Sequence, residues 1–349
     1  MQNNAPRLLI AGTGSGCGKT TVTSALLRAL QRRGAALGAF KCGPDYIDPM
    51  FHTAVLGIPS RNLDLFFVDE NEVRGQLARH VPAGGLGIIE GVYHAKSGHP
   101  GGSLSSADIF TYLYFKEMNI NPQTPKDPNR DRFVLSKGHC APGLYSVLAN
   151  RGYFDVSELQ KLRHIGAMLQ GHPDMKGTPG VDMSSGSLGQ GISAAVGMAL
   201  AGKLDNKDYR VYTLLGDGES EEGQVWEAAM FAGHHKLDNL CVIVDYNGLQ
   251  IDGPVSEVGG PEPFDKKFEA FGFEVITVNG NDFDELEKAF AAARACKGKP
   301  FAIIAKTTKG KGVSFMEGQV GWHGKAPNTE QYEAAKKELT ENLEVLQNG

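Results

Sequence analysis

Several features are scarce in this sequence of 349 residues. Its five cysteines show no CxxC or zinc spacing, and their odd number and scatter predict reduced thiols in a cytoplasmic protein. No segment approaches ~20 uninterrupted apolar residues, so we expect no membrane span. The opening MQNNAPRLLIAG lacks a charged lead-in and a long apolar core, so we expect no signal peptide.

Excess charge of one sign is also lacking. The formal net charge is −5, which disfavours a nucleic-acid-binding surface. Glycine is abundant instead, with 45 residues that cluster where phosphate groups would sit. The length allows one large or two medium domains with a real core. The composition therefore indicates an α/β enzyme.

The first ninety residues begin with a phosphate-binding pattern. An apolar run over residues 7–11 precedes GTGSGCGKTT, and an amphipathic helix is expected from about Val22 to Arg33. Glycines let backbone N–H groups turn toward a phosphate at Gly18, Lys19 adds a point charge, and the Thr20 hydroxyl can bind Mg²⁺. The spacing departs from the standard motif, because its first glycine falls on residue 13, a threonine. A strand, such a turn and a helix favour ATP binding.

Two further segments resemble cobyrinic acid a,c-diamide synthase: FKCGPDYIDPMFH (40–52) and SRNLDLF (60–66). The resemblance implies that Asp45 or Asp48, together with Glu90, helps to hold Mg²⁺·ATP. Glu90 is expected at the end of a buried strand in GIIEG (87–91); alone it would be read as a water-facing carboxylate. The resemblance stops after Val92, without the rest of the ATPase sheet or the glutaminase. Residues 1–92 are thus expected to be a truncated P-loop α/β fragment.

Two apolar segments further along end in metal-binding residue types. RVYTLLGDG (210–218) and LCVIVDYNGLQ (240–250) read as strands. Adjacent parallel strands present their carboxyl ends at one sheet edge, so Asp217 and Asn247 should face one point. A hard cation accepts such oxygen ligands, with diphosphate oxygens completing its shell. Gly218 leaves room for the diphosphate, and the helix expected near residue 219 directs its positive end there.

From Tyr93 onward the sequence resembles the N-terminal, diphosphate-binding half of transketolase. The resemblance rests on SGHPGGSLSSADI, RDRFVLSKGHCAPGLYS, GHPDMKGTPGVDMSSGSLGQGISAAVGMALA and LLGDGESEEGQVWEAA. It implies a three-layer α/β fold with a parallel sheet over residues 93–349. It also implies thiamine diphosphate with Mg²⁺ or Ca²⁺ as cofactors, and the Leu249 carbonyl as a third metal ligand beside Asp217 and Asn247.

The resemblance assigns roles to further residues. His139 would contact the diphosphate, and His99 and His172 would contact ketose hydroxyls and shuttle protons, which suits imidazole. Gly186 and Leu188 would lie against the rings of the cofactor. Glu222 and Glu227 would form an acidic pair near the subunit interface. The last two, at i and i+5 of a helix, could equally be surface charges. In KTTKGKGVSFMEGQVGWHGKAP the family's diphosphate-binding histidine falls near Val320, so the role of His323 stays open; the other histidines (His52, His80, His164, His234, His235) are expected to be solvated.

The glutamate that activates thiamine diphosphate lies, in this family, in the pyrimidine-binding half, which the sequence lacks. The resemblance therefore implies a partner, the C-terminal transketolase subunit, in a heterotetramer that transfers a two-carbon ketol unit between phosphorylated sugars in the pentose phosphate pathway. Three alternatives remain: 1-deoxyxylulose-5-phosphate synthase, an ATP-binding fragment of cobalamin biosynthesis, and an inactive chimera. WHGKAP and RDRFVLSKGH favour transketolase.

The two resemblances meet near Val92 without a linker. The transketolase form should have a leading helix before YHAKSGHPGG, but GGLGIIEGV stands there, and its glycines and alternation disfavour a helix. We therefore expect a junction between two unrelated segments, 1–92 and 93–349, that arose by recombination, assembly or construction.

Overall fold

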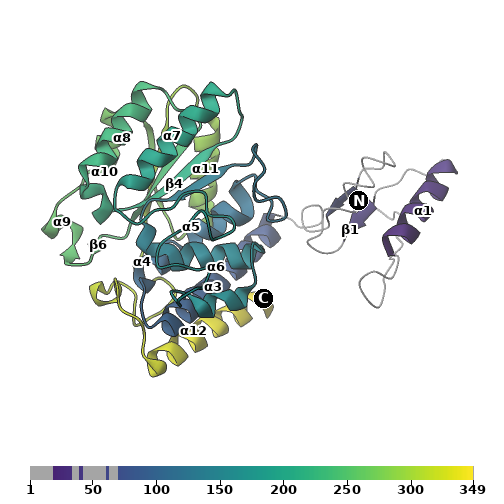
Figure 1. Cartoon of the computed structure of the whole chain (residues 1–349), viewed down its shortest axis with the longest axis horizontal. Helices are drawn as coiled ribbons and strands as arrows, with labels where there is room; N and C mark the ends of the chain where they lie inside the picture. The colour runs from purple at the N-terminus through teal and green to yellow at the C-terminus, as the bar shows by residue number, and fades with distance from the viewer. Residues whose placement is uncertain (1–18, 34–38, 42–59, 63–69, 349) are drawn as a thin grey trace. The chain divides into compact units, whose positions relative to one another are not determined.

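The computed structural model describes residues 19–33, 39–41, 60–62 and 70–348, and the chain forms two compact units, Met1–Val73 and Arg74–Gly349 (Figure 1). In the first unit, α1 (Lys19–Arg32) matches the helix expected after the phosphate-binding pattern, and β1 (Ala39–Lys41) pairs in parallel with β2 (Ser60–Asn62). Gly18, Asp45 and Asp48 lie outside the described residues. None of the described helices is long and apolar enough to cross a bilayer.

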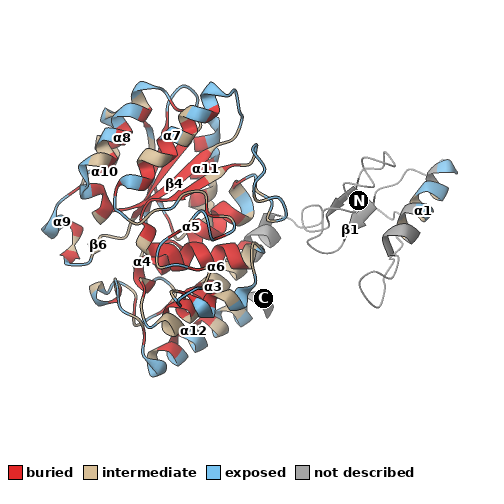
Figure 2. Ribbon diagram, in the orientation of Figure 1, coloured by how far each residue is buried: buried red, intermediate tan, exposed pale blue. Residues whose placement is uncertain are grey.

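The second unit is built on a five-stranded parallel sheet with the order β3-β4-β5-β9-β8. Its strands are rich in β-branched and leucine side chains, and the central ones are almost wholly buried, as is typical of a sheet covered on both faces (Figure 2). This confirms the expected α/β class. The strand bounds are β3 Arg132–Leu135, β4 Val211–Gly216, β5 Leu240–Tyr246, β8 Glu274–Asn279 and β9 Phe301–Lys306.

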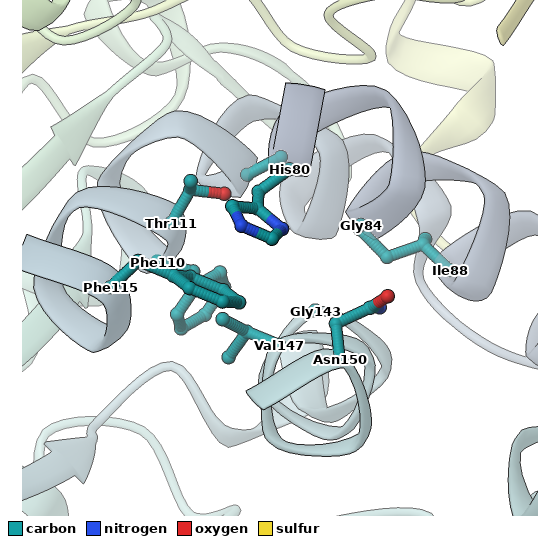
Figure 3. Close-up of a pocket in the computed structure, with 10 residues that line it drawn as sticks. His80, Gly84, Ile88, Phe110, Thr111, Phe115, Gly143, Val147 and Asn150 are labelled. Carbon is teal, nitrogen blue, oxygen red and sulfur yellow. The ribbon is translucent and has the colours of Figure 1, made fainter. Parts of the chain in front are cut away.

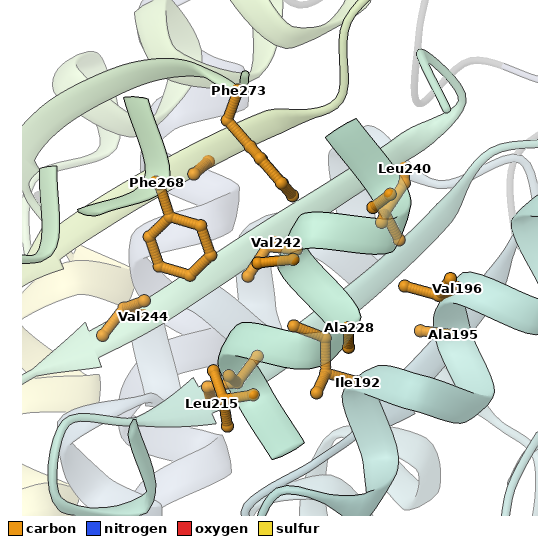
Figure 4. Close-up of a cluster of buried hydrophobic side chains, with 14 of the residues drawn as sticks. Ile192, Ala195, Val196, Leu215, Ala228, Leu240, Val242, Val244, Phe268 and Phe273 are labelled. Carbon is orange, nitrogen blue, oxygen red and sulfur yellow. The ribbon is translucent and has the colours of Figure 1, made fainter. Parts of the chain in front are cut away.

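Helices pack on both faces of this sheet. On one face α7 (Gln190–Leu204), α8 (Gly223–His234) and α10 (Phe264–Ala270) bury small and aromatic side chains against the valines and leucines of the strands (Figure 4). On the other face α5 (Ala107–Tyr112) and α11 (Phe283–Ala295) meet through stacked rings of Tyr112 and Phe290, whose centroids are 5.0 Å apart. The alternation of side chains along each strand sends residues to both layers.

Further elements complete the unit. They are α4 (Pro100–Ser105), η2 (Leu113–Glu117), η3 (Gly138–Cys140), α6 (Ala141–Arg151), η4 (Val156–Lys161), η5 (Gly218–Glu221), β6 (Leu249–Gln250), β7 (Gly253–Pro254), α9 (Val255–Val258), η6 (Val320–Trp322) and α12 (Thr329–Asn348).

The structure corrects the strand expected at residues 87–91. One helix, α3 (Glu70–Ala95), runs through the expected junction at Val92, and the second unit begins at Arg74. Glu90 therefore lies within a helix and not at a strand end. Its carboxylate accepts hydrogen bonds from Gln160 Nε2 (2.9 Å) and from the Tyr332 hydroxyl of α12.

Tertiary packing explains why a glycine-rich segment is helical. Five glycines and one proline within α3 cost roughly 8 kcal/mol against alanine. Burying four apolar side chains offsets this by about 6–12 kcal/mol. Two of the glycines are also needed for close packing: a Cβ at Gly87 would lie 2.2 Å from Ser146 Oγ, and one at Gly85 would lie 3.0 Å from Leu339 Cδ2. The buried side chains are Leu77, Ile88, Ile89 and Val92.

α3 also packs closely on η2 and α6. A cavity of only about 10 Å³ separates these elements near His80, Gly84 and Gly143 (Figure 3). The His80 ring stacks on Phe115 with 3.8 Å between centroids, and burial lowers its pKa. His80 is therefore half-buried against another element and not freely solvated as expected, whereas His164, His234 and His235 are exposed. His52 lies outside the described residues.

Candidate cofactor site at the carboxyl edge of the sheet

The ends of β4 and β5 lie side by side, because Gly216 is paired with Asp245 in the parallel register. Asp217 follows β4, and its carboxylate accepts hydrogen bonds from Gly218 N (2.8 Å) and from Gly248 N (2.6 Å). The second bond ties it to the turn that carries Asn247. The predicted meeting of Asp217 and Asn247 at one sheet edge is thus confirmed.

Asp217 is buried, and this burial raises its pKa to about 7, with the nearby Asp245 carboxylate adding to the effect. A buried carboxylate with an elevated pKa is stabilised by a nearby positive charge. Beside it stand the Asn247 side-chain oxygen, which accepts from Leu249 N (3.1 Å), and the Leu249 carbonyl. One carboxylate, one amide and one carbonyl form an oxygen donor set suited to Mg²⁺ or Ca²⁺.

Lys309, which the sequence analysis missed, lies beside these donors. Its ammonium donates to the Leu249 carbonyl (2.8 Å) and lies 2.9 Å from His323 Nδ1. The side chain is 1% exposed, and burial lowers its pKa. The Leu249 carbonyl therefore has one positively charged partner within the chain. The residue stands in the quoted segment KTTKGKG, where a lysine between glycine-rich turns could have been singled out.

Lys137, also missed, carries a second buried positive charge. Its Nζ lies 2.5 Å from Asp245 Oδ2 and donates to the Gly102 carbonyl at 2.9 Å. Burial lowers the pKa of Lys137, but the Asp245 carboxylate outweighs this, and the pKa is raised. Asp245 in turn accepts from Asn247 Nδ2 (3.1 Å), which orients the amide oxygen of Asn247. Lys137 precedes His139 in the quoted SKGH motif, so its position was available from the sequence.

Three histidines gather next to these lysines. Ring centroids are 5.1 Å apart for His99 and His139, 5.5 Å for His99 and His323, and 5.4 Å for His139 and His323. Burial lowers the pKa values to about 4 for His99 and His139 and to about 3 for His323. The three rings are therefore neutral near pH 7 and can accept or donate a hydrogen bond. The structure places His323, whose role the sequence analysis left open, in this cluster.

His172 lies in an adjoining loop. A Cβ on Gly186 would lie 3.0 Å from His172 Cδ2, and a Cβ on Gly138 would lie 2.7 Å from Gly186 N. These glycines let the His139 loop and the Gly186 loop approach closely, as a pocket for a flat ring would require. Leu188 follows in the same loop and is 39% exposed.

Glu219 joins three of these loops and was also missed. Its carboxylate accepts from Ser136 Oγ (2.6 Å), Gly189 N (2.9 Å) and Gly216 N (2.9 Å). The side chain is buried, and burial raises its pKa. Glu222 and Glu227, by contrast, are exposed beside and on α8. That exposure fits both an interface role and ordinary surface charges.

These features agree with a diphosphate-bearing cofactor and its cation. Two buried ammonium groups supply positive charge, and the buried His99 Nδ1 has no hydrogen-bond partner within the described part of the chain. No three His, Cys, Asp or Glu side chains gather into a metal cluster in the described ranges, so a transition-metal site of that kind is not indicated there. Fold and site together define an α/β cofactor-binding domain.

Comparison with known proteins identifies this domain. Residues 79–345 match the family described as transketolase, thiamine diphosphate binding domain. The 6-deoxy-6-sulfo-D-fructose transketolase subunit SqwG of Clostridium sp. (strain MSTE9) is 50% identical over 242 residues, which cover 69% of this chain and 88% of that protein. An apulose-4-phosphate transketolase subunit of Phocaeicola vulgatus is 44% identical over 260 residues, covering 74% and 92%.

Single-chain transketolases match over a smaller share of their length. Human transketolase is 47% identical over 241 residues, which cover 69% of this chain and 38% of that protein. The crystal structure of transketolase from Campylobacter jejuni superposes with a TM-score of 0.71 at 37% identity, covering 76% of this chain and 43% of the other. The chain belongs to the transketolase family and corresponds to its N-terminal, thiamine-diphosphate-binding subunit. The match begins at residue 79, before the junction expected at Val92, and none of these comparisons supports the resemblance to cobyrinic acid a,c-diamide synthase.

Proposed function

We propose that this chain, together with a C-terminal transketolase subunit, transfers a two-carbon ketol unit between phosphorylated sugars. The observation that carries the proposal is the juxtaposition of Asp217 with the Asn247–Leu249 turn, beside two buried lysines and three neutral histidines. The subunit-length relatives bear names of the same kind. Bound thiamine diphosphate would supply an electron sink for the carbanion that such a transfer requires.

The residues of this chain would bind and orient the cofactor. Asp217, Asn247 and the Leu249 carbonyl would hold Mg²⁺, or Ca²⁺ in its place. Lys309 and His139 would contact diphosphate oxygens. Gly218 would lie beside them, and its lack of a side chain lets Gln250 pack closely, because a Cβ there would lie 2.9 Å from Gln250 Cβ. In this arrangement the positive charge needed near the diphosphate comes from the protein as well as from the cation.

The loops above the sheet edge would form the substrate side of the site. His99 and His172 would donate to or accept from ketose hydroxyls, and their neutral rings could move a proton at those oxygens. Gly186 and Leu188 would border the cofactor rings. The relatives act, by their names, on a sulfonated fructose or on apulose 4-phosphate, so the sugar is expected to vary within the family.

A partner subunit would complete the site. Met230 and Phe231 of α8 are 57% and 41% exposed, and Ile251 in the turn after β6 is 62% exposed. Large apolar side chains that are exposed can mark a surface that a partner covers. Glu222 precedes α8 and Glu227 lies within it, and both would reach the partner in a heterotetramer with two copies of each subunit.

The direct test is a titration of the purified chain with thiamine diphosphate, first with Mg²⁺ and then with EDTA. Trp226 donates to the Ser220 carbonyl of η5 and Trp322 adjoins His323, so both indoles should report binding by fluorescence. Saturable binding that EDTA abolishes is the expected result. Binding of ATP with no binding of thiamine diphosphate would contradict the proposal and return attention to Gly18, Lys19 and Thr20.

A further inference from the structure

Arg163 lies between the two loops that carry His99 and His172. Its guanidinium Nη1 donates to Ser97 Oγ (2.8 Å), two residues before His99. Its Nη2 donates to the Gly171 carbonyl (3.3 Å), directly before His172. One side chain therefore bridges two segments that are more than seventy residues apart in the sequence.

The backbone of Arg163 is held in a conformation that an arginine rarely adopts. Its φ is +61°, in the left-handed region, and its N–H donates to the Leu169 carbonyl (2.8 Å), which closes the loop over residues 163–169. Such a conformation costs a non-glycine residue about 1 kcal/mol or more, and it is often found where a side chain must be aimed. Here it directs the guanidinium toward the two histidine loops.

Close packing around the guanidinium fixes its place. The buried Nε has no hydrogen-bond partner in the described part of the chain. A Cβ on Gly171 would lie 3.2 Å from this Nε, so glycine at 171 lets the loop lie against the planar group. The fork geometry of arginine suits a bridge between two acceptors, which lysine cannot reproduce with one nitrogen.

We propose that Arg163 is a positioning residue that clamps the His99 loop to the His172 loop and so sets the spacing of the two imidazoles. The inference rests on the proposed function, in which both histidines contact the sugar. The hydrogen bonds of Arg163 run to Ser97 and Gly171, and neither residue is proposed to hold the diphosphate or the cation.

The positive charge of Arg163 also affects the pKa values of His99 and His172. Burial lowers the pKa of His99 and of His172, and the Arg163 guanidinium lowers both further. Other groups that face His99 and lower its pKa are His139, His172 and Lys309, and the His323 ring lies against it; His139 also acts on His172. Loss of the Arg163 charge should therefore raise both pKa values, while the remaining groups stay in place.

The test compares full-length Arg163→Gln, Arg163→Lys and Ser97→Ala with the unaltered chain. Hydrogen exchange is followed in peptides covering residues 97–99 and 169–172. We expect Arg163→Gln and Arg163→Lys to speed exchange about tenfold in both peptides, since a charge-assisted hydrogen bond is lost at each end. Ser97→Ala should speed exchange in the first peptide and leave the second protected. Faster exchange only within residues 163–169, or none, would overturn the clamp.

A histidine-selective NMR titration gives a readout that a purely structural role would not move. The His99 and His172 signals are assigned with His→Gln variants. Arg163→Gln should shift both titrations to higher pH, and Arg163→Lys should largely restore them. Unshifted titrations in Arg163→Gln would contradict the inference. If Arg163→Gln does not fold, Ser97→Ala decides the question alone by exchange in 97–99.

Two controls separate this inference from the proposed function. Lys161→Gln removes a nearby positive charge that is 56% exposed and paired with Glu158 at 2.5 Å, and it should change neither measurement. The thiamine diphosphate titration is repeated on each variant and should be unchanged. Failure of the unaltered chain to bind the cofactor would defeat the proposed function, whereas normal binding together with unchanged loop exchange in Arg163→Gln would defeat the clamp only.

Discussion

Lys137 and Asp245 form an ion pair in the interior, with 2.5 Å between Nζ and Oδ2 and side chains that are 2% and 0% exposed. Ser105 and Ser106, at the end of α4, donate to the same carboxylate at 2.6 and 3.2 Å. The pair therefore joins the end of β3, the end of β5 and the helix after the His99 loop. The ion pair thus holds together three elements that carry residues of the candidate site.

Replacing Lys137 with methionine should destabilise the chain by about 3–5 kcal/mol, because it leaves the Asp245 charge buried and unpaired. The measurement is urea-induced unfolding at pH 7. Lys203→Met is the matched control: it breaks a half-exposed pair with Asp238 and should cost less than about 1 kcal/mol. Equal losses for the two variants would contradict this view of the pair.

Asp217→Ala should abolish the Mg²⁺-dependent binding of thiamine diphosphate, since it removes the one carboxylate of the proposed donor set. Fluorescence titration with and without Mg²⁺ measures this. Asp208→Ala, at an exposed position, should bind as the unaltered chain does. Normal metal-dependent binding by Asp217→Ala would refute the metal assignment.

Lys309→Met should weaken thiamine diphosphate binding about 10- to 100-fold, because a charge-assisted hydrogen bond to a phosphate contributes about 1.5–3 kcal/mol. Thiamine without phosphates should bind both forms equally, which separates a diphosphate contact from general damage to the pocket. Isothermal calorimetry with the two ligands provides the comparison. A parallel loss for both ligands would show that Lys309 acts on the pocket as a whole.

Asp108→Asn should stabilise the chain at pH 7 and have little effect near pH 3.5. Burial raises the pKa of Asp108 from 3.8 to about 6, so its ionisation opposes folding as the pH rises from about 4 through 6. The penalty is fully present above pH 6 and amounts to up to about 3 kcal/mol. Asparagine can still accept from Asn281 Nδ2, which lies 2.8 Å from Asp108 Oδ2. Thermal unfolding at several pH values should show a Tm difference that grows with pH; a constant difference would exclude the ionisation as its cause.

A chain shortened to residues 74–349 should keep thiamine diphosphate affinity and Tm close to those of the full chain. All residues of the candidate site belong to the second compact unit. The comparison uses the same titration and calorimetric unfolding. A shortened chain that starts at residue 93 serves as the contrasting variant and should unfold more readily, because it lacks the buried Ile88, Ile89 and Val92 of α3. Equal stability of the two would indicate that α3 contributes little.

Strand-end motifs were the part of the site that the sequence predicted well. Asp217 and Asn247 each close an apolar strand, and parallel pairing puts such ends together whatever the details of packing. The nucleotide-binding residues expected within residues 1–69 stay predictions. Of the elements expected there, the helix α1 is confirmed.

Local propensity and tertiary packing disagreed at α3, and there the sequence analysis was wrong. Glycines at 85 and 87 disfavour an isolated helix, but Ser146 and Leu339 occupy the space that side chains at those positions would need. Neither partner is near α3 in the sequence. His80 was misread for the same reason, since Phe115 stacks on it from another element.

By itself the sequence determined the family of the larger unit, the sheet edge that carries Asp217 and Asn247, and the types of chemistry at that edge, because these depend on short motifs and strand periodicity. Only the tertiary structure decided which charges neighbour that edge: Lys137, Lys309 and Glu219 come from separate loops, and His323 joins His99 and His139 across more than 180 residues. Side-chain burial and the distances between groups on different elements set pKa values and ion pairs, and a linear sequence does not contain those distances.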